Sequence, residues 1–329
     1  MSAASRREFL ATLAAATVGA AALGCHRKAS GGTVNVRLGV CALRISLPIF
    51  VAKERGRFEA HGLSIELQSY PTAQPMIDDL LLGRLDAAGF AAYPIVFASA
   101  KSLKSVDDAP VLAASIVEDR EHRLSYALAR KGAGISFPKG LKGKRVGILP
   151  TVAYQKWLAA ILRKAGLAEG DVTVTPTAPP MQARALADGA IDVLFTNDPM
   201  ATAILAEGGA EIVDDGPPCA AWLRDPFPFG AFALGGGFAR ARRAEAEQLV
   251  AAIDDAIDLI RKDPAAAKRA METYVRPTER AFVGKYPDAR FFRSSELDAA
   301  AVAVEVEREH QLGIFAGEAN VKSWAETPR

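Results

Sequence analysis

The chain has 329 residues, of which 50% are hydrophobic and 24% charged, the balance of a soluble globular protein long enough for two domains. The formal net charge is +2, and the two most basic runs, residues 139–145 and 240–243, are short. Because Lys and Arg form no long stripe with interleaved aromatic residues, this composition argues against binding of nucleic acid.

Residues 1–24 resemble an export signal. Residues 5–10 (SRREFL) are similar to a twin-arginine signal, and the apolar stretch that follows is too short to span a bilayer. Leu23-Gly24-Cys25 resembles a lipoprotein cleavage site in which Cys25 takes the lipid, although Ala22 stands where a larger aliphatic residue is usual. Cleavage by an ordinary signal peptidase nearby is the alternative. Either way, we expect a periplasmic or cell-surface protein, with residues 25–33 as a polar tether.

After the tether, segments with apolar residues at every second position alternate with segments that have them at every third or fourth. The first part of the chain predicts strands at residues 34–40, 63–68, 87–90, 111–116 and 124–130. It predicts helices at residues 47–55, 75–82 and 93–100. We place a crossing into a second lobe near Leu124.

The second part of the chain repeats this order. It predicts strands at residues 145–149, 172–175 and 211–213, with a helix at 152–165 between the first two. Pro-rich and Gly-rich turns at residues 216–218 and 225–229 indicate a return crossing, and residues 230–235 predict a strand back in the first lobe. Long amphipathic helices follow at about residues 242–261, 264–274 and 295–312.

One module occurs twice, at residues 76–94 and 181–199. Each copy runs from Met through a helix to a Gly (Gly83, Gly189), has an Asp three residues later (Asp86, Asp192), and ends at a Pro. A repeated module indicates two similar lobes, and the symmetry of the Asp pair favours a structural role. Ligands bind beyond the carboxyl ends of strands in open α/β sheets, so we expect the loops at 90–94 and 195–199 to face one cleft.

The alternation of strands and helices predicts an α/β protein whose two lobes each contain a mostly parallel sheet flanked by helices. We assign residues 34–124 and 230–329 to a discontinuous first lobe, and residues 125–229 to the second. The two crossings would form a hinge about which the lobes close on a ligand.

Residues 36–70 resemble the start of solute-binding proteins of ABC importers in the nitrate/sulfonate/taurine group, which are related to thiamine-pyrimidine-precursor proteins. The similarity covers nearly all of residues 34–329. The matching features are Gly39-Val40, Leu47-Pro48, residues 52–56, Phe58, Gly62-Leu63, residues 83–86, residues 141–147, Asp192 and Asp198-Pro199.

The resemblance implies a type II periplasmic-binding-protein fold, a monomer that captures a small solute in the interlobe cleft, and an ABC permease as membrane partner. Two departures disfavour a small inorganic anion as the ligand. Asn197 and Asp198 stand where the family often has an aromatic residue and a Glu, and the loop at residues 41–46 is unusually apolar.

Candidate ligand contacts lie at helix starts and in loops that should face the cleft. Thr151 precedes a helix whose free N–H groups, at Val152 and Ala153, favour an anionic group, although simple capping is the alternative. Thr72, Ala73 and Gln74 occupy the equivalent loop in the first lobe. In the loop at 41–46, beside Cys41 and Leu43, Arg44 can clamp an anion or simply face solvent. The remaining candidates are Phe90, Tyr93, Tyr154, Asn197, Asp198, Trp222 and Phe229, with Arg224 as a weaker one.

Neither a metal site nor a catalytic constellation is evident, and we predict no cofactor. Cys41 and Cys219 are either a disulfide or two small buried side chains. The favoured ligand is an organic molecule with one anionic or strongly polar end. Two other functions remain open: an enzyme of the pyrimidine or menaquinone-precursor type on the same fold, and a ligand sensor for a membrane receptor.

Overall fold

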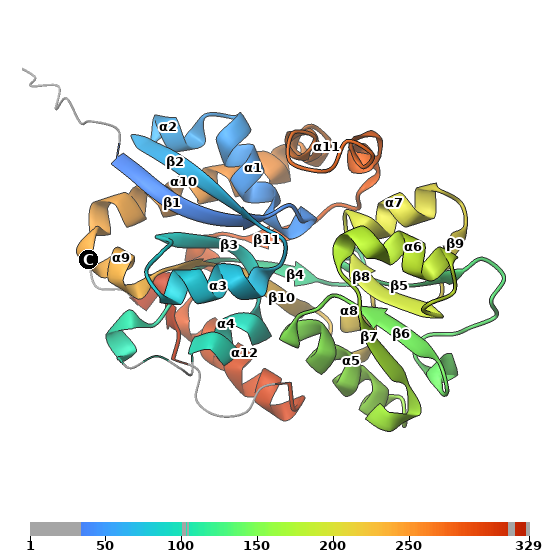
Figure 1. Cartoon of the computed structure of the whole chain (residues 1–329). Coiled ribbons are helices and arrows are strands. Elements are labelled where there is room, and N and C mark those ends of the chain that lie inside the picture. The colour runs from blue at the N-terminus through green and yellow to red at the C-terminus, as the bar shows by residue number, and fades with distance from the viewer. Residues whose placement is uncertain (1–33, 101–102, 104, 315–319, 327–329) are drawn as a thin grey trace, which may run out of the picture. The chain divides into compact units, whose positions relative to one another are not determined.

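Two β-sheets form the framework of the computed structural model, which describes residues 34–100, 103, 105–314 and 320–326 (Figure 1). The first sheet has the order β11-β4-β10-β3-β1-β2, with β12 beside β4, and the second has the order β7-β6-β8-β5-β9. The first comprises β1 (Val34–Cys41), β2 (Leu63–Tyr70), β3 (Ala87–Ala92), β4 (Val111–Glu118), β10 (Phe227–Leu234), β11 (Arg290–Phe292) and β12 (Lys322–Ser323). The second comprises β5 (Ser125–Arg130), β6 (Arg145–Ile148), β7 (Thr173–Pro176), β8 (Val193–Asn197) and β9 (Ala210–Ile212). The predicted signal, Cys25 and the tether lie outside the described residues.

Helices cover both faces of each sheet, which confirms the α/β class (Figure 1). Those beside the first sheet are α1 (Leu47–Glu54), α2 (Arg57–Ala60), α3 (Ala73–Leu81), α4 (Tyr93–Ala100), α9 (Gly236–Ala241), α10 (Arg243–Lys262), α11 (Pro264–Lys268) and α12 (Ala299–Gln311). Those beside the second are α5 (Val152–Lys164), α6 (Gln182–Ala187), α7 (Met200–Ala206) and α8 (Pro218–Trp222). The predicted stripe of α10, Leu249, Ile253, Ile257 and Ile260, is buried.

Strand directions are more mixed than the sequence pattern predicted. β1 pairs in parallel with β2 and β3, whereas β10 is antiparallel to both β3 and β4. The reason is the path of the chain: β4 leaves the first sheet at the end where β10 enters it, so the two strands run in opposite directions.

The chain passes between the sheets twice, from β4 to β5 over residues 119–124 and from α8 to β10 over residues 223–226. The fully buried carboxylate of Glu118 joins the first passage to α8, the helix that precedes the second. Its Oε2 accepts hydrogen bonds from the N–H groups of Leu124 (2.8 Å) and Ser125, and its Oε1 accepts from Ser125 Oγ and Ala220 N, both at 2.9 Å. The lobe boundaries and the hinge motion themselves stay predictions.

The repeated module has the same chemistry in both copies. Asp86 accepts bonds from the backbone N–H (2.8 Å) and guanidinium of Arg37 on β1, and Asp192 does so from Arg145 on β6, also at 2.8 Å to the backbone. This confirms the structural role of the two Asp residues, although each partner is an Arg on the neighbouring strand. The Gly of each copy ends its helix at positive φ, +69° for Gly83 and +73° for Gly189, where other residues are strained.

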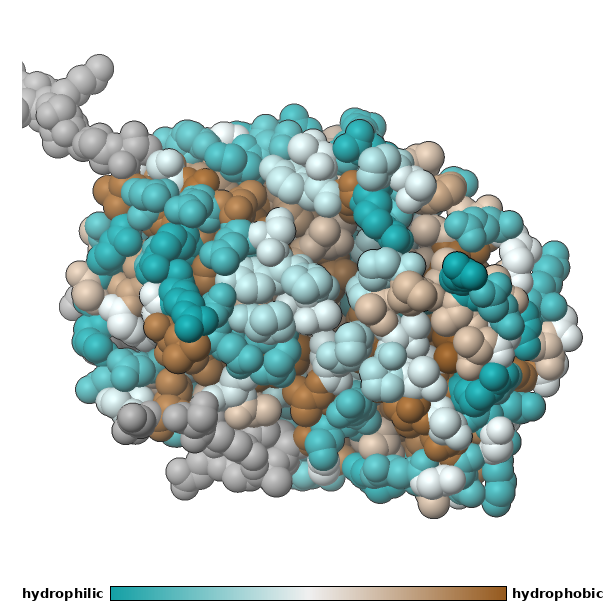
Figure 2. Space-filling model, viewed as in Figure 1, coloured by the Kyte–Doolittle hydropathy of each residue, from teal (hydrophilic) through white to brown (hydrophobic). Residues whose placement is uncertain are grey.

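Hydrophilic residues cover most of the face shown in Figure 2, and hydrophobic residues appear between them in small groups. Within the described part of the chain, no helix is both long enough and apolar enough to span a bilayer.

Candidate functional site

A small cavity lies between the two sheets, close to the carboxyl ends of β1, β3 and β8. Its volume is about 30 Å³, and because roughly 10–15 Å³ suffices for one water molecule, it has room for about two. It is lined by Leu43, Ile45, Pro71, Thr72, Ala73, Ala92, Ile95, Leu149, Thr151, Tyr154, Pro179, Asn197 and Phe229. An organic solute would therefore fit only after the walls move apart.

The N-termini of two helices meet this cavity, and each helix lies beside a different sheet. Thr72 is the N-cap of α3 and Thr151 the N-cap of α5, and both line the cavity. Thr151 Oγ1 accepts a hydrogen bond from Tyr154 N at 3.4 Å, whereas Thr72 makes no side-chain cap. The first N–H groups of a helix have no partner within it and carry its positive dipole end. The cavity is thus electrically suited to a negatively charged group.

Two polar atoms at the cavity have no hydrogen-bond partner. Tyr154 and Asn197 are each 3% exposed, and both the Tyr154 hydroxyl and Asn197 Oδ1 are unpartnered. Burial raises the pKa of the Tyr154 hydroxyl well above its ordinary value, although the nearby Asn197 amide partly opposes this. The buried Thr196, next to Asn197 in the chain, is satisfied, since its Oγ1 donates to Gln182 Oε1 at 2.7 Å. Unpartnered buried polar atoms are costly, so Tyr154 and Asn197 are candidate polar contacts for a ligand.

Arg44 is engaged by the protein itself. Its Nε lies 3.0 Å from Asp198 Oδ2 in an ion pair whose side chains are 2% and 0% exposed. Its Nη1 donates to Pro287 O at 2.9 Å, and its Nη2 donates to Arg123 O. Tyr126 Oη also donates to Asp198 Oδ2, at 3.0 Å. Arg44 and Asp198 therefore tie the two sheets together beside the passage at residues 119–124, and their charges neutralise each other instead of facing the cavity.

Several other predicted contacts lie away from the cavity. Phe90 packs in the core against Phe232 and Phe291, and Gln74 donates to Asp78 and Ser99. Val152, Ala153 and Trp222 do not line it either. Cys41 is buried, and burial raises the pKa of its thiol to about 12. Both Cys41 and Cys219 are free, buried thiols, so of the two alternatives the structure shows two small buried side chains and no disulfide.

Of the predicted residues, Leu43, Thr72, Thr151, Tyr154, Asn197 and Phe229 are brought together at the cavity. The residues missed are mainly apolar. Pro71 and Leu149 adjoin predicted loop positions, and those neighbours were a usable signal. Ala73, predicted together with Thr72 and Gln74, also lines the cavity. Ile95 was not predictable, because it lies within the apolar helix α4, where all positions look alike in sequence.

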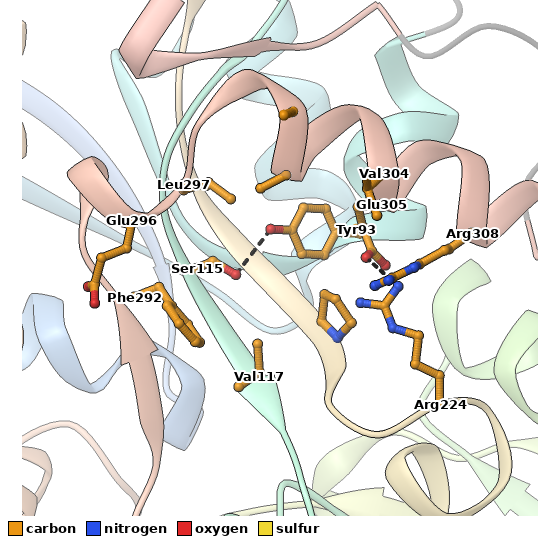
Figure 3. A pocket seen from close by; sticks show the side chains of 13 residues that line it. Tyr93, Ser115, Val117, Arg224, Phe292, Glu296, Leu297, Val304, Glu305 and Arg308 are labelled. Atoms are coloured by element: carbon orange, nitrogen blue, oxygen red, sulfur yellow. Dashed lines mark hydrogen bonds and ion pairs between the residues drawn. The ribbon is translucent and has the colours of Figure 1, made fainter.

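Tyr93 lies instead at a second, larger cavity beneath α12, with a volume of about 350 Å³ (Figure 3). Its hydroxyl donates to Ser115 Oγ at 3.1 Å. At the end of the cavity near α8, Arg224 Nη1 lies 3.0 Å from Glu305 Oε2.

Replacing Glu305 by glutamine should remove a pH dependence of stability. Burial raises the pKa of Glu305 from its ordinary 4.5 to about 7, although Arg224 and Arg308 oppose this shift. The folded state therefore binds the Glu305 proton more tightly than the unfolded state does. The stability that this proton contributes is fully present below about pH 4.5 and is lost as the pH rises through about 7. We expect wild type to lose about 3 kcal/mol across this window relative to Glu305→Gln. Urea unfolding at a series of pH values measures it.

The exposed Glu307→Gln on the same helix is the matched control and should keep the wild-type slope. Equal slopes for wild type and Glu305→Gln would contradict the prediction. Glu309 and Tyr93 also face Glu305, and burial raises the pKa of both groups, which favours their uncharged forms.

The sequence also matches a known family. Residues 29–275 match the sequence model of the NMT1-like family. The chain belongs to this family. Comparison with curated proteins found no match.

Solved structures share the fold of this NMT1-like chain. The periplasmic aliphatic sulphonate binding protein SsuA from Escherichia coli is 18% identical, with a TM-score of 0.67 over 88% of this chain and 96% of that one. The periplasmic nitrate-binding protein NrtA from Synechocystis PCC 6803 is 15% identical, with a TM-score of 0.65 over 87% and 83%. The desulfurization enzyme DSZB is 18% identical, with a TM-score of 0.60 over 89% and 95%. These matches confirm the predicted two-lobed fold class, and the match to the family model confirms the predicted family resemblance.

Proposed function

We propose that this protein is the extracytoplasmic solute-binding component of an ABC importer. It captures a small organic solute between its two sheets and presents the closed form to a membrane permease. The observation that carries the proposal is the pair of unpartnered polar groups, Tyr154 Oη and Asn197 Oδ1, placed in an apolar cavity between two helix N-termini. The periplasmic sulphonate-binding and nitrate-binding proteins among its structural neighbours support the same function.

The solute has an anionic head and an apolar body. The N-termini of α3 and α5 supply N–H groups for an anion, and the Tyr154 hydroxyl adds a donor. Leu43, Ile45 and Ile95 supply apolar wall. An alkanesulfonate or a carboxylate has this chemistry.

Entry of the solute requires opening, because the cavity holds about 30 Å³ whereas small-molecule pockets span roughly 300–1,000 Å³. We assign the motion to two lobes, residues 34–124 with 230–329 and residues 125–229, that turn about the two passages at 119–124 and 223–226. The protein acts as a monomer. It is exported by its twin-arginine signal and anchored through a lipid on Cys25.

An enzymatic function has one structural neighbour in its favour, the desulfurization enzyme. The cavity lining favours binding, because among the described residues that line it Tyr154 alone carries a titratable side chain. Incubation of the purified protein with solutes that bind, followed by mass spectrometry of the solution, distinguishes the two: a binding protein returns the solute unchanged, and an enzyme converts it.

Replacing Tyr154 by phenylalanine should weaken solute binding without lowering the stability of the free protein. The free protein should unfold at the same urea concentration or a higher one, because a buried unpartnered hydroxyl is removed. Affinity for the solute should fall by roughly tenfold or more, since a hydrogen bond to a charged group is worth about 1.5–3 kcal/mol. Thermal shift with series of alkanesulfonates, carboxylates and matched neutral alcohols finds the solute, and calorimetry measures its affinity.

Tyr70→Phe is the control, because the Tyr70 hydroxyl already donates to Asp79 at 2.6 Å outside the cavity. It should leave solute affinity unchanged. If no anionic solute raises the melting temperature, and native mass spectrometry of the protein from its own host shows no bound small molecule, the proposed function is refuted.

A further inference from the structure

The cavity beneath α12 is separate from the one between the sheets, and no residue lines both. It lies between α12, the strands β4 and β10, and Tyr93 at the start of α4 (Figure 3). Its volume of about 350 Å³ falls within the range of roughly 300–1,000 Å³ that small-molecule pockets occupy. Unlike the cavity between the sheets, it has room for an organic molecule in the present conformation.

The two ends of this cavity differ in chemistry. Arg224, Arg308 and Glu305 gather at one end, whereas Phe292 and Leu297 lie at the other (Figure 3). Apolar side chains make up most of the wall: Val117, Pro228, Phe292, Leu297, Ala300, Ala301 and Val304. Val304, in this wall, is 45% exposed.

Positive charge dominates the polar end. Arg224 and Arg308 carry two permanent positive charges. Two acidic residues oppose them: Glu305, which pairs with Arg224 at 3.0 Å, and Glu309, which is fully buried. Neither carboxyl oxygen of Glu309 has a hydrogen-bond partner, and burial raises the pKa of this group well above its ordinary value, which favours its uncharged form. Glu296 is at the far end, where it pairs with Arg261 at 2.6 Å. The region around Arg224 and Arg308 therefore attracts an anion.

We propose that this cavity is a second ligand site, which binds an amphipathic anion. The apolar body lies along Val117, Leu297 and Val304, and the anionic head meets Arg308 and the free edge of Arg224. Arg224 belongs to the passage that leads from α8 back to β10, and its Nε donates to Pro226 O at 3.0 Å. The ligand thus contacts one of the two segments that connect the sheets.

Octanoate is the probe, with octylamine and octanol as cationic and neutral ligands of the same chain length. By calorimetry, wild type should bind octanoate at least tenfold more tightly than either. Arg308→Gln should weaken octanoate binding roughly tenfold, as expected for a lost charge-assisted hydrogen bond, and Ala301→Trp, which fills the cavity, should abolish it. The exposed Arg280→Gln should leave it unchanged.

The position of the ligand decides which cavity is used. Anomalous scattering from crystals soaked with ω-bromo-octanoate should place the bromine between α12 and β4. Bromine between the two sheets, no bound bromine, or unchanged octanoate affinity in Ala301→Trp would overturn the proposal. Because Ala301 is remote from Tyr154 and Asn197, Ala301→Trp should still bind the solute of the first site, so the two proposals fail independently.

Discussion

Replacing Glu118 by alanine is expected to lower the free energy of unfolding by about 5 kcal/mol. The carboxylate accepts four hydrogen bonds, from the backbone of Leu124, Ser125 and Ala220 and from the Ser125 hydroxyl. All these donors are buried, and each one left without an acceptor costs about 1–3 kcal/mol. Urea unfolding followed by circular dichroism measures the loss.

Glu118→Gln keeps one carbonyl oxygen as an acceptor, and its free energy of unfolding should lie between those of wild type and Glu118→Ala. Glu121→Ala, an exposed position in the same passage, should change stability by no more than about 0.5 kcal/mol. A loss of less than about 1 kcal/mol in Glu118→Ala would mean that the contact of the first passage with α8 does not depend on this carboxylate. A full loss would identify Glu118 as the group that holds the start of β5 and the start of α8 against the end of β4.

Replacing Arg44 by methionine should destabilise the protein by about 3–5 kcal/mol, because it leaves the carboxylate of Asp198 buried without its cation. The variant also removes the donors that reach Pro287 O and Arg123 O, so contact between the sheets is lost along with the ion pair. Adding Asp198→Asn should recover part of the loss, since the uncompensated charge is then gone. A urea-unfolding double-mutant cycle gives the coupling energy.

Arg145→Met is the matched control for Arg44→Met. Arg145 pairs with Asp192 at 2.7 Å, but its side chain is 44% exposed, and exposed ion pairs are worth about 0–1 kcal/mol. Similar losses for Arg44→Met and Arg145→Met would show that burial does not strengthen the Arg44–Asp198 pair. If Arg44→Met instead kept its stability and lost solute affinity, Arg44 would be a ligand contact, as its loop position first indicated.

Much of the architecture could be predicted from the sequence, because helix ends and buried helix faces depend on residues that are close together in the chain. Gly83 and Gly189 end their helices because only glycine adopts positive φ without strain, and a reader of the sequence needs no tertiary information to see it. The apolar stripe of α10 predicted its buried face for a similar reason, since helical periodicity alone places Leu249, Ile253 and Ile257 together. Thr151 was predicted as a ligand contact because it stands between a strand and a helix in the sequence, and it does line the cavity.

Other properties depend on which distant segments meet, and these only the tertiary structure decided. Arg44 has the same local sequence whether it clamps a ligand or pairs with Asp198, and the packing of the first sheet against the second selects the ion pair. Tyr93 and Arg224 each looked like contacts of one cleft, yet the course of α12 across β4 and β10 places them at another cavity. Hydrogen-bond partners and burial are set by long-range contacts, and periodicity and turn chemistry contain no information about them.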